Sequence, residues 1–225
     1  MSLSFRKSIM TANVVIFSSI AIILASVHAE FAYPILTYLK FDFAEIPVMI
    51  VLMIFGAIPA LITETIHWLA LTVTHGDWLG PLMKFLAVAP MIIGFWAGSK
   101  VYTKLSVKKG GKPNFITILA FGIVLGIILR VIVCTLTNIV VLSFVAPYYL
   151  DFAKGLLNAA GISATSTFDV MLWVLFFTGI FNTIHVPFST LLAAIIVKGA
   201  IVRIPSIAEK SWLPSIYQAK TKRTY

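Results

Sequence analysis

The chain has 225 residues, of which 60% are hydrophobic and 11% are charged, and its mean hydropathy is +1.02. Because a soluble domain is about half apolar and about a quarter charged, this composition excludes an ordinary soluble fold and indicates an integral membrane protein. The net charge of +9 is expected mainly in cytoplasmic loops, rather than on a nucleic-acid-binding face. The single cysteine, Cys134, lies within an apolar run, which excludes a disulfide framework.

The first apolar run covers roughly 9–28 and follows Arg6 and Lys7. It has features of a secretory signal peptide, including the small-residue sequence VHA that ends at Ala29. The run is longer than the apolar part of a signal peptide, which has about 7–15 residues, and further apolar runs follow it. We therefore predict a retained membrane helix, with a cleaved signal peptide as the alternative.

Five more apolar runs follow, and each is predicted to form a membrane helix, which needs about 20 residues to cross the hydrocarbon. The second and third runs are short individually but too long together for one crossing. The sequence FGAIPA between them places Gly56 and Pro59 where the chain can reverse. We predict two short, tilted helices with a tight turn, and the alternative is one long kinked helix. The five runs cover 44–56, 58–74, 80–102, 115–147 and 170–203.

The distribution of lysine and arginine favours six spans over five. With six, the N-terminus, the loop SKVYTKLSVKKGGK and the basic C-terminal tail all face the cytoplasm. The outer loops, near 29–43, 75–79 and 148–169, then hold only Lys40 and Lys154 as cations. Five spans would place the lysine-rich loop and the N-terminus on opposite sides. The predicted fold is therefore an all-α, six-transmembrane-helix bundle in the cell membrane, with both termini cytoplasmic.

The predicted domain organisation is one transmembrane domain over residues 1–204, followed by a basic cytoplasmic tail over 205–225. This tail is suited to lying on anionic lipid. The last apolar run is too long for one simple helix and contains Gly179 and Pro187. The segment 168–180 is therefore a candidate for a separate short helix that folds in from the outer loop.

Polar side chains from three predicted helices are expected at one depth, near the outer face. At 1.5 Å per residue, Asn138 lies about 34 Å above the cytoplasmic start of the fifth helix. Asn182 and His185, on a common face, lie at the outer end of the last helix, while Asp42 and Glu45 lie at the outer start of the second. Because polar groups at membrane depth usually face a cavity or one another, we predict a pocket open to the outside.

Each of these residues also has a purely structural interpretation. Asp42 and Glu45 can stabilise a helix N-terminus, Asn138 can join two helices, and His185 can simply be hydrogen-bonded. Arg130 lies about 22 Å along the fifth helix, where an arginine requires a partner or water.

Glu64 and His67 lie three residues apart on the third predicted helix. Glu64 is about 9 Å above the inner end of that helix, a depth that does not match the pocket. We predict that the two side chains pair with each other, and we assign them no transport role.

The residues expected at the pocket, in this order, resemble the riboflavin-type substrate-binding (S) components of energy-coupling factor (ECF) vitamin transporters. KFDFAEIPVMIVLMIFGAIPAL is similar to the family signature yDfsdiPallagfifGP. GPLMKFLAVAPMIIGFWAGSKVYTK resembles the fourth helix and basic loop of the family, and LRVIVCTLTNIVVLSFVAPYYL resembles its fifth helix. IFNTIH is similar to PFNLIK at the outer end of the sixth helix. The resemblance extends over most of the chain and is weakest at the termini and at 150–170.

This resemblance implies a six-helix bundle that holds a vitamin in an outward-facing pocket, with Asn138 and Asn182 bonded to the polar atoms of a flavin. The family lysine is His185 here and the preceding proline is Ile180, which leaves an altered flavin or another heterocycle open as the ligand. A competing alignment uses PFST, with Ser189 in place of the asparagine.

Aromatic side chains near the outer face are candidates for enclosing the ring of the ligand, while Asn138, Asn182 and His185 are predicted to contact its polar edge. Asp42 is expected to fix the first outer loop as a lid. The aromatic candidates are Phe31, Tyr38, Phe43, Trp78 and Phe181.

The first predicted helix carries Ala21 and Ala25 four residues apart, with Ser18 one turn before Ala21. Small residues at this spacing allow another helix to approach closely in lipid. In the resembled family an alanine stripe on this helix contacts the membrane scaffold (T) subunit, so these three residues are predicted partner contacts. Packing within the chain is the alternative.

Sequence motifs for energy coupling or hydrolysis are absent. The chain lacks the GxxxxGK[ST] motif of a phosphate-binding loop for ATP. It also lacks the HExxH motif of metalloproteases and the GxSxG motif of serine hydrolases, so the sequence does not support either enzyme class. We predict a substrate-capture subunit, not an enzyme, that uses no cofactor or metal, binds riboflavin or a close analogue, and depends on a scaffold subunit and two ATPase subunits. The alternatives are a same-fold binder of pantothenate or a pyrimidine precursor, and a membrane-embedded enzyme that uses Arg130, His185 and Asp42.

Overall fold

The computed structural model describes residues 3–111, 113–204 and 212, and these residues are almost entirely helical. The predicted tail over 205–225 lies outside the described residues, apart from Trp212. The elements are, in chain order, α1 (Leu3–Ser26), β1 (Glu30–Ala32), β2 (Lys40–Asp42), α2 (Glu45–Phe55), α3 (Ala57–His75), α4 (Leu79–Lys108), α5 (Phe115–Val140), the π-helical turn η1 (Val141–Val145), α6 (Tyr148–Ala159) and α7 (Thr167–Arg203).

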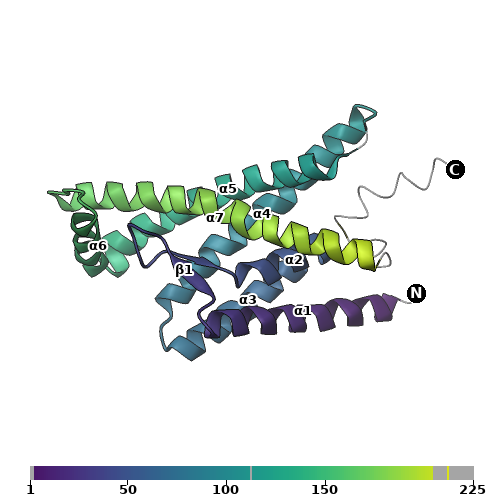
Figure 1. Cartoon of the computed structure of the whole chain (residues 1–225), viewed down its shortest axis with the longest axis horizontal. Helices are drawn as coiled ribbons and strands as arrows, with labels where there is room; N and C mark the ends of the chain where they lie inside the picture. The colour runs from purple at the N-terminus through teal and green to yellow at the C-terminus, as the bar shows by residue number, and fades with distance from the viewer. Residues whose placement is uncertain (1–2, 112, 205–211, 213–225) are drawn as a thin grey trace.

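The helix ends separate into two groups along the long axis of the molecule (Figure 1). The start of α1, the α4–α5 connection and the end of α7 lie toward one end. The hairpin of β1 and β2 and the short helix α6 lie toward the other end. The lysine-rich connection after α4 is therefore on the same side as the start of α1 and the end of α7.

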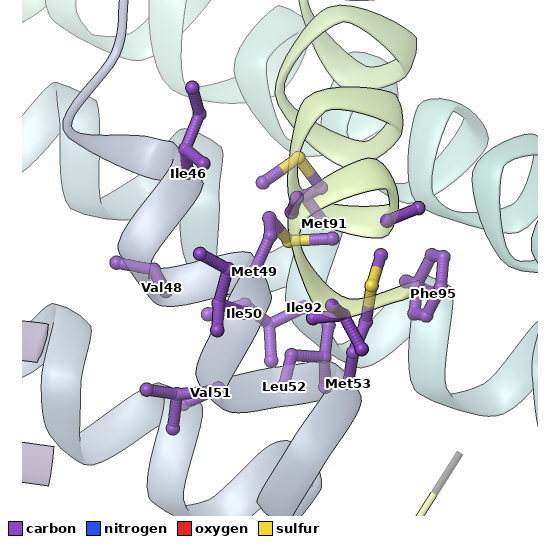
Figure 2. Close-up of a cluster of buried hydrophobic side chains, with 14 of the residues drawn as sticks. Ile46, Val48, Met49, Ile50, Val51, Leu52, Met53, Met91, Ile92 and Phe95 are labelled. Atoms are coloured by element: carbon purple, nitrogen blue, oxygen red, sulfur yellow. The ribbon is translucent and has the colours of Figure 1, made fainter. Parts of the chain in front are cut away.

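Within the described residues, five helical segments are long and apolar enough to cross a membrane: α1, α3, α4, α5 with η1, and α7. The sequence predicted six, and α2 is the exception because its 11 residues extend only about 16 Å, roughly half the hydrocarbon thickness. Every residue of α2 from Glu45 to Met53 is buried. Figure 2 shows its side chains packed against Met91, Ile92 and Phe95 of α4. A helix enclosed by protein need not match the bilayer, which explains why α2 can be short.

The break between α2 and α3 is where the sequence predicted it, and the alternative of one kinked helix is wrong. Gly56 separates the two helices with a φ of 96°, a conformation that side chains with a Cβ rarely adopt. Pro59 lies in the first turn of α3, where its missing N–H removes no helical hydrogen bond.

The antiparallel helices α4 and α5 approach each other closely through glycines. Gly94 and Gly98 of α4 face α5, where a Cβ on Gly94 would lie 2.5 Å from the backbone oxygen of Leu125. Gly122 of α5 similarly leaves room for the ring of Phe95. Small residues four positions apart allow such backbone contact between membrane helices. Both pairs, Gly94 with Gly98 and Gly122 with Gly126, show this spacing in the sequence, which could have revealed the interface.

The connections at the hairpin end differ from the prediction in two ways. Segment 168–180 is not a separate helix, since α7 is continuous and begins at a capping box in which Ser166 and Asp169 bond each other's backbone N–H. The short helix in this region is instead α6, in the connection between η1 and α7. The fold is also not purely α-helical, because β1 and β2 pair antiparallel with Glu30 opposite Asp42.

Candidate ligand-binding pocket

A partly open cavity of about 450 Å³ lies between the hairpin, α2, α4, α5 and α7. Ligand pockets are commonly about 300–1,000 Å³, so this cavity has room for a small molecule. All five polar residues that the sequence placed at one depth line it: Asp42, Glu45, Asn138, Asn182 and His185.

Arg130 joins three helices at the floor of this cavity. Its guanidinium donates to both carboxylate oxygens of Glu45, at 2.8 and 2.9 Å, and its Nε donates to Oδ1 of Asn182 at 2.7 Å. The two-pronged pairing with a carboxylate is the strongest geometry available to arginine. Arg130 and its partners are all buried, so α2, α5 and α7 are tied together at one point.

The remaining donors of Arg130 are also used. Nη1 contacts Sδ of Met91 at 3.4 Å, and Nη2 lies 3.1 Å from Nδ1 of His185. A guanidinium has five N–H groups, and these five contacts account for all of them when Nδ1 of His185 is the acceptor of that ring. The prediction that Arg130 requires a partner is thus confirmed, and the residue keeps no donor for a ligand.

His185 lies between Arg130 and the hairpin of β1 and β2. Its Nε2 accepts from the backbone N–H of Asp42 at 3.3 Å, while Nη2 of Arg130 faces Nδ1. A neutral imidazole accepts at only one ring nitrogen, so these two contacts are alternatives. The single O–H of Ser189, one turn further along α7, lies within hydrogen-bond distance of Oε2 of Glu45 at 3.3 Å and of the backbone oxygen of His185 at 3.0 Å, so Ser189 belongs to the same network.

Asp42 connects the hairpin to α2 and α4. Its Oδ1 accepts from the backbone N–H of Ala44 at 2.6 Å, which is the helix-start role that the sequence left open, and its Oδ2 pairs with Lys84 of α4. Sequence reasoning missed Lys84. The signal was available, because a lysine within an apolar run requires a partner for the same reason as Arg130.

The two asparagines differ in how far they are engaged. Asn182 accepts from Arg130 and donates to the backbone oxygen of Thr178 at 2.9 Å. Asn138 is only partly buried and donates to the backbone oxygen of Cys134 at 2.8 Å, which leaves its Oδ1 without a donor from the described residues. The hydroxyl of Thr178 is buried at the cavity and likewise has no partner among those residues.

Two of the predicted aromatic residues, Tyr38 and Phe181, line the cavity, whereas Phe43 does not. Burial raises the pKa of the Tyr38 hydroxyl above its ordinary range, so this group keeps its proton and can donate. Phe43 packs 5.3 Å from the ring of Phe188, centroid to centroid, and lies against the main apolar core. The structure places Phe43 against the core and not at the cavity, and its contact with a ligand ring stays a prediction. Phe31 and Trp78 also lie outside the cavity lining.

The stripe of small residues on α1 points inward. Ser18, Ala21 and Ala25 are all buried, and the two alanines cluster with Ala44 and Leu71. These residues allow α1 to pack closely on α2 and α3, so the prediction that they contact a partner helix is corrected to the alternative of packing within the chain.

Comparisons with known proteins bear on the fold. No family model and no curated protein matched this sequence. A solved structure of the S component of a bacterial ECF transporter is similar, with a TM-score of 0.63 and 21% sequence identity. The alignment covers 88% of this chain and 98% of the other. This chain shares the fold of that S component.

Proposed function

We propose that this chain is the substrate-capture subunit of an ECF-type vitamin importer in the cell membrane, with riboflavin or a closely related flavin as its ligand. The observation that carries the proposal is the cavity, where polar residues from the hairpin, α2, α5 and α7 converge as the resemblance implied. The fold shared with an S component supports it. In this proposal a scaffold subunit and two ATPase subunits supply the energy for import.

The proposed ligand contacts are the polar groups that still have unused hydrogen-bonding capacity. Lys84, Asn138, Thr178 and Tyr38 would contact the polar edge of the ligand, and Phe181 would pack on its ring. Asn182 and His185 line the same cavity and would contact the ligand from the floor, with positions set by Arg130. Asp42 would hold the hairpin over the pocket through Lys84.

The proposed topology has six membrane segments, with the short buried α2 as one of them and both termini in the cytoplasm. The lysine-rich connection, the start of α1 and the end of α7 lie on one side of the molecule, and this supports the proposed topology (Figure 1). Single cysteines introduced at Ser106 and Asn158 in a Cys134→Ser background test this orientation. A membrane-impermeant thiol reagent added to intact cells should label the Asn158→Cys variant and leave the Ser106→Cys variant unlabelled. The reverse pattern would invert the topology.

The ligand is tested by purification in detergent and titration with riboflavin, pantothenate and a pyrimidine precursor, with tryptophan fluorescence as the readout. We expect the protein to copurify with a yellow, fluorescent flavin and to bind riboflavin most tightly. Unchanged riboflavin affinity after Asn138→Ala and Asn182→Ala together would reject the site. Turnover of a substrate by the purified chain alone would instead favour a membrane-embedded enzyme.

A second ligand class has one observation in its favour. Lys84 retains 20% of its side-chain exposure and has one partner among the described residues, so it can donate to a ligand carboxylate. A same-fold binder of an anionic vitamin such as pantothenate would use it in this way. The titration distinguishes the two, because such a protein would bind pantothenate and not riboflavin.

A further inference from the structure

The helix α3 holds a buried acid and histidine outside the ligand cavity. Nδ1 of His67 lies 3.2 Å from Oε2 of Glu64, which confirms the pairing that the sequence predicted. Both side chains are at most 1% exposed. Oε1 of Glu64, Nε2 of His67 and the indole N–H of Trp68 have no hydrogen-bond partner among the described residues. Because unpaired buried polar groups are rare and costly, this part of α3 requires an explanation.

No cation other than a protonated His67 is left over to neutralise Glu64 among the described residues. The helices packed against α3 are α1, α2 and α4. Between residues 8 and 26, α1 carries no ionisable side chain. The charged groups that act on Glu64 from the other two helices are Glu45 and Lys84, and these are already paired with Arg130 and Asp42 respectively.

We propose that Glu64 is a proton-binding site, with its carboxyl group held as an acid whose O–H donates to Nδ1 of a neutral His67. Arg130 and Lys84 balance Glu45 and Asp42, so the buried network is neutral when the Glu64–His67 pair holds one proton more than an ionised acid beside a neutral imidazole. An ionised Glu64 beside a neutral His67 would leave one uncompensated negative charge, which is strongly unfavourable inside a protein. It would also leave one carboxylate oxygen without a donor. Placing the proton on His67 instead would bury two charges and leave a charged Nε2–H unpaired among the described residues. This inference does not depend on the identity of the ligand in the pocket.

Infrared spectroscopy of the purified protein in lipid nanodiscs at pH 7 tests the proposal directly. The parent protein should show the C=O stretch of a buried carboxylic acid, and Glu64→Gln should lack it. Asp151→Asn, which alters an exposed acid on α6, is the matched control and should retain the band. An identical carboxylic-acid region in the parent and in Glu64→Gln would overturn the proposal.

Two further measurements extend the test, and the first of them does not require Glu64→Gln to fold. In His67→Gln the acid band should persist and move to a different frequency, because its hydrogen-bond acceptor has changed. An absent band in that variant and in the parent would overturn the proposal. In addition, the folded parent binds a proton that the unfolded chain releases, so its unfolding equilibrium constant should rise about tenfold per pH unit between roughly pH 5 and 8 from this group. A folded Glu64→Gln should lack this contribution, and coincident pH profiles would contradict it.

Discussion

The floor and the wall of the pocket differ in how completely their hydrogen-bonding groups are used. At the floor, each of the five N–H groups of Arg130 faces a partner, namely Glu45, Asn182, Met91 or His185. On the wall, Lys84 has one partner for its three N–H groups, and Oδ1 of Asn138 and the hydroxyl of Thr178 have none among the described residues. The difference separates two roles for polar residues at membrane depth. A saturated network assembles helices, whereas an unsaturated group is available to a ligand.

The largest expected effect comes from removing Arg130 from the network at the floor of the pocket. Arg130→Met leaves the Glu45 carboxylate buried without its partner, and this should lower the free energy of unfolding by about 3–5 kcal/mol. Unfolding of the purified protein in detergent measures the loss. The double variant Arg130→Met with Glu45→Met should recover most of the stability, since no unpaired charge remains. A single variant as stable as the parent would show that the floor does not hold the helices together.

A wall residue should affect binding, with a smaller loss of stability than a floor residue. Lys84→Met removes a charged donor that faces the ligand, so we expect affinity to fall by about 1.5–3 kcal/mol, which is roughly 10- to 150-fold. Lys84 keeps 20% of its side-chain exposure, and Asp42 also has the backbone N–H of Ala44 as a donor, so we expect a smaller loss of stability than for Arg130→Met. Titration and unfolding of the same preparation separate the two. A stability loss equal to that of Arg130→Met would place Lys84 with the floor.

The two asparagines compare floor and wall directly, because Asn182 belongs to the floor network and Asn138 belongs to the wall. Asn182→Ala removes the acceptor of the Arg130 Nε–H and should lower the free energy of unfolding by about 1–3 kcal/mol, together with affinity. Asn138→Ala should reduce affinity by about 1 kcal/mol and leave unfolding almost unchanged. If both variants lose stability equally, Asn138 joins helices and does not bind the ligand.

The smallest effect is expected from one hydroxyl group. Tyr38→Phe keeps the ring at the cavity and removes one donor, so affinity should fall by about 0.5–1 kcal/mol. Phe43→Leu is its control, because Phe43 lies outside the cavity and its substitution should leave the dissociation constant unchanged. A loss of affinity in the control alone would mean that the hairpin rearranges around the ligand.

Patterns carried by single residues predicted much of this molecule. Gly56 marked the turn between α2 and α3, and the spacing of Glu64 and His67 indicated their contact. Predictions failed where a sequence pattern is compatible with two different packing arrangements. The stripe of Ser18, Ala21 and Ala25 permits close packing on any helix, and its sequence does not specify whether that helix belongs to the same chain.

The sequence by itself determined that the chain is built from apolar helices and that isolated polar residues within them must find partners, because burial of an unpaired polar group is costly in any fold. Only the tertiary structure decided which partners they find. The short α2 is enclosed by its neighbours, and this brings Glu45 to Arg130 while Asp42 of the hairpin meets Lys84. Those pairings depend on contacts between residues 42 and 85 positions apart, and local spacing does not encode contacts at such separation.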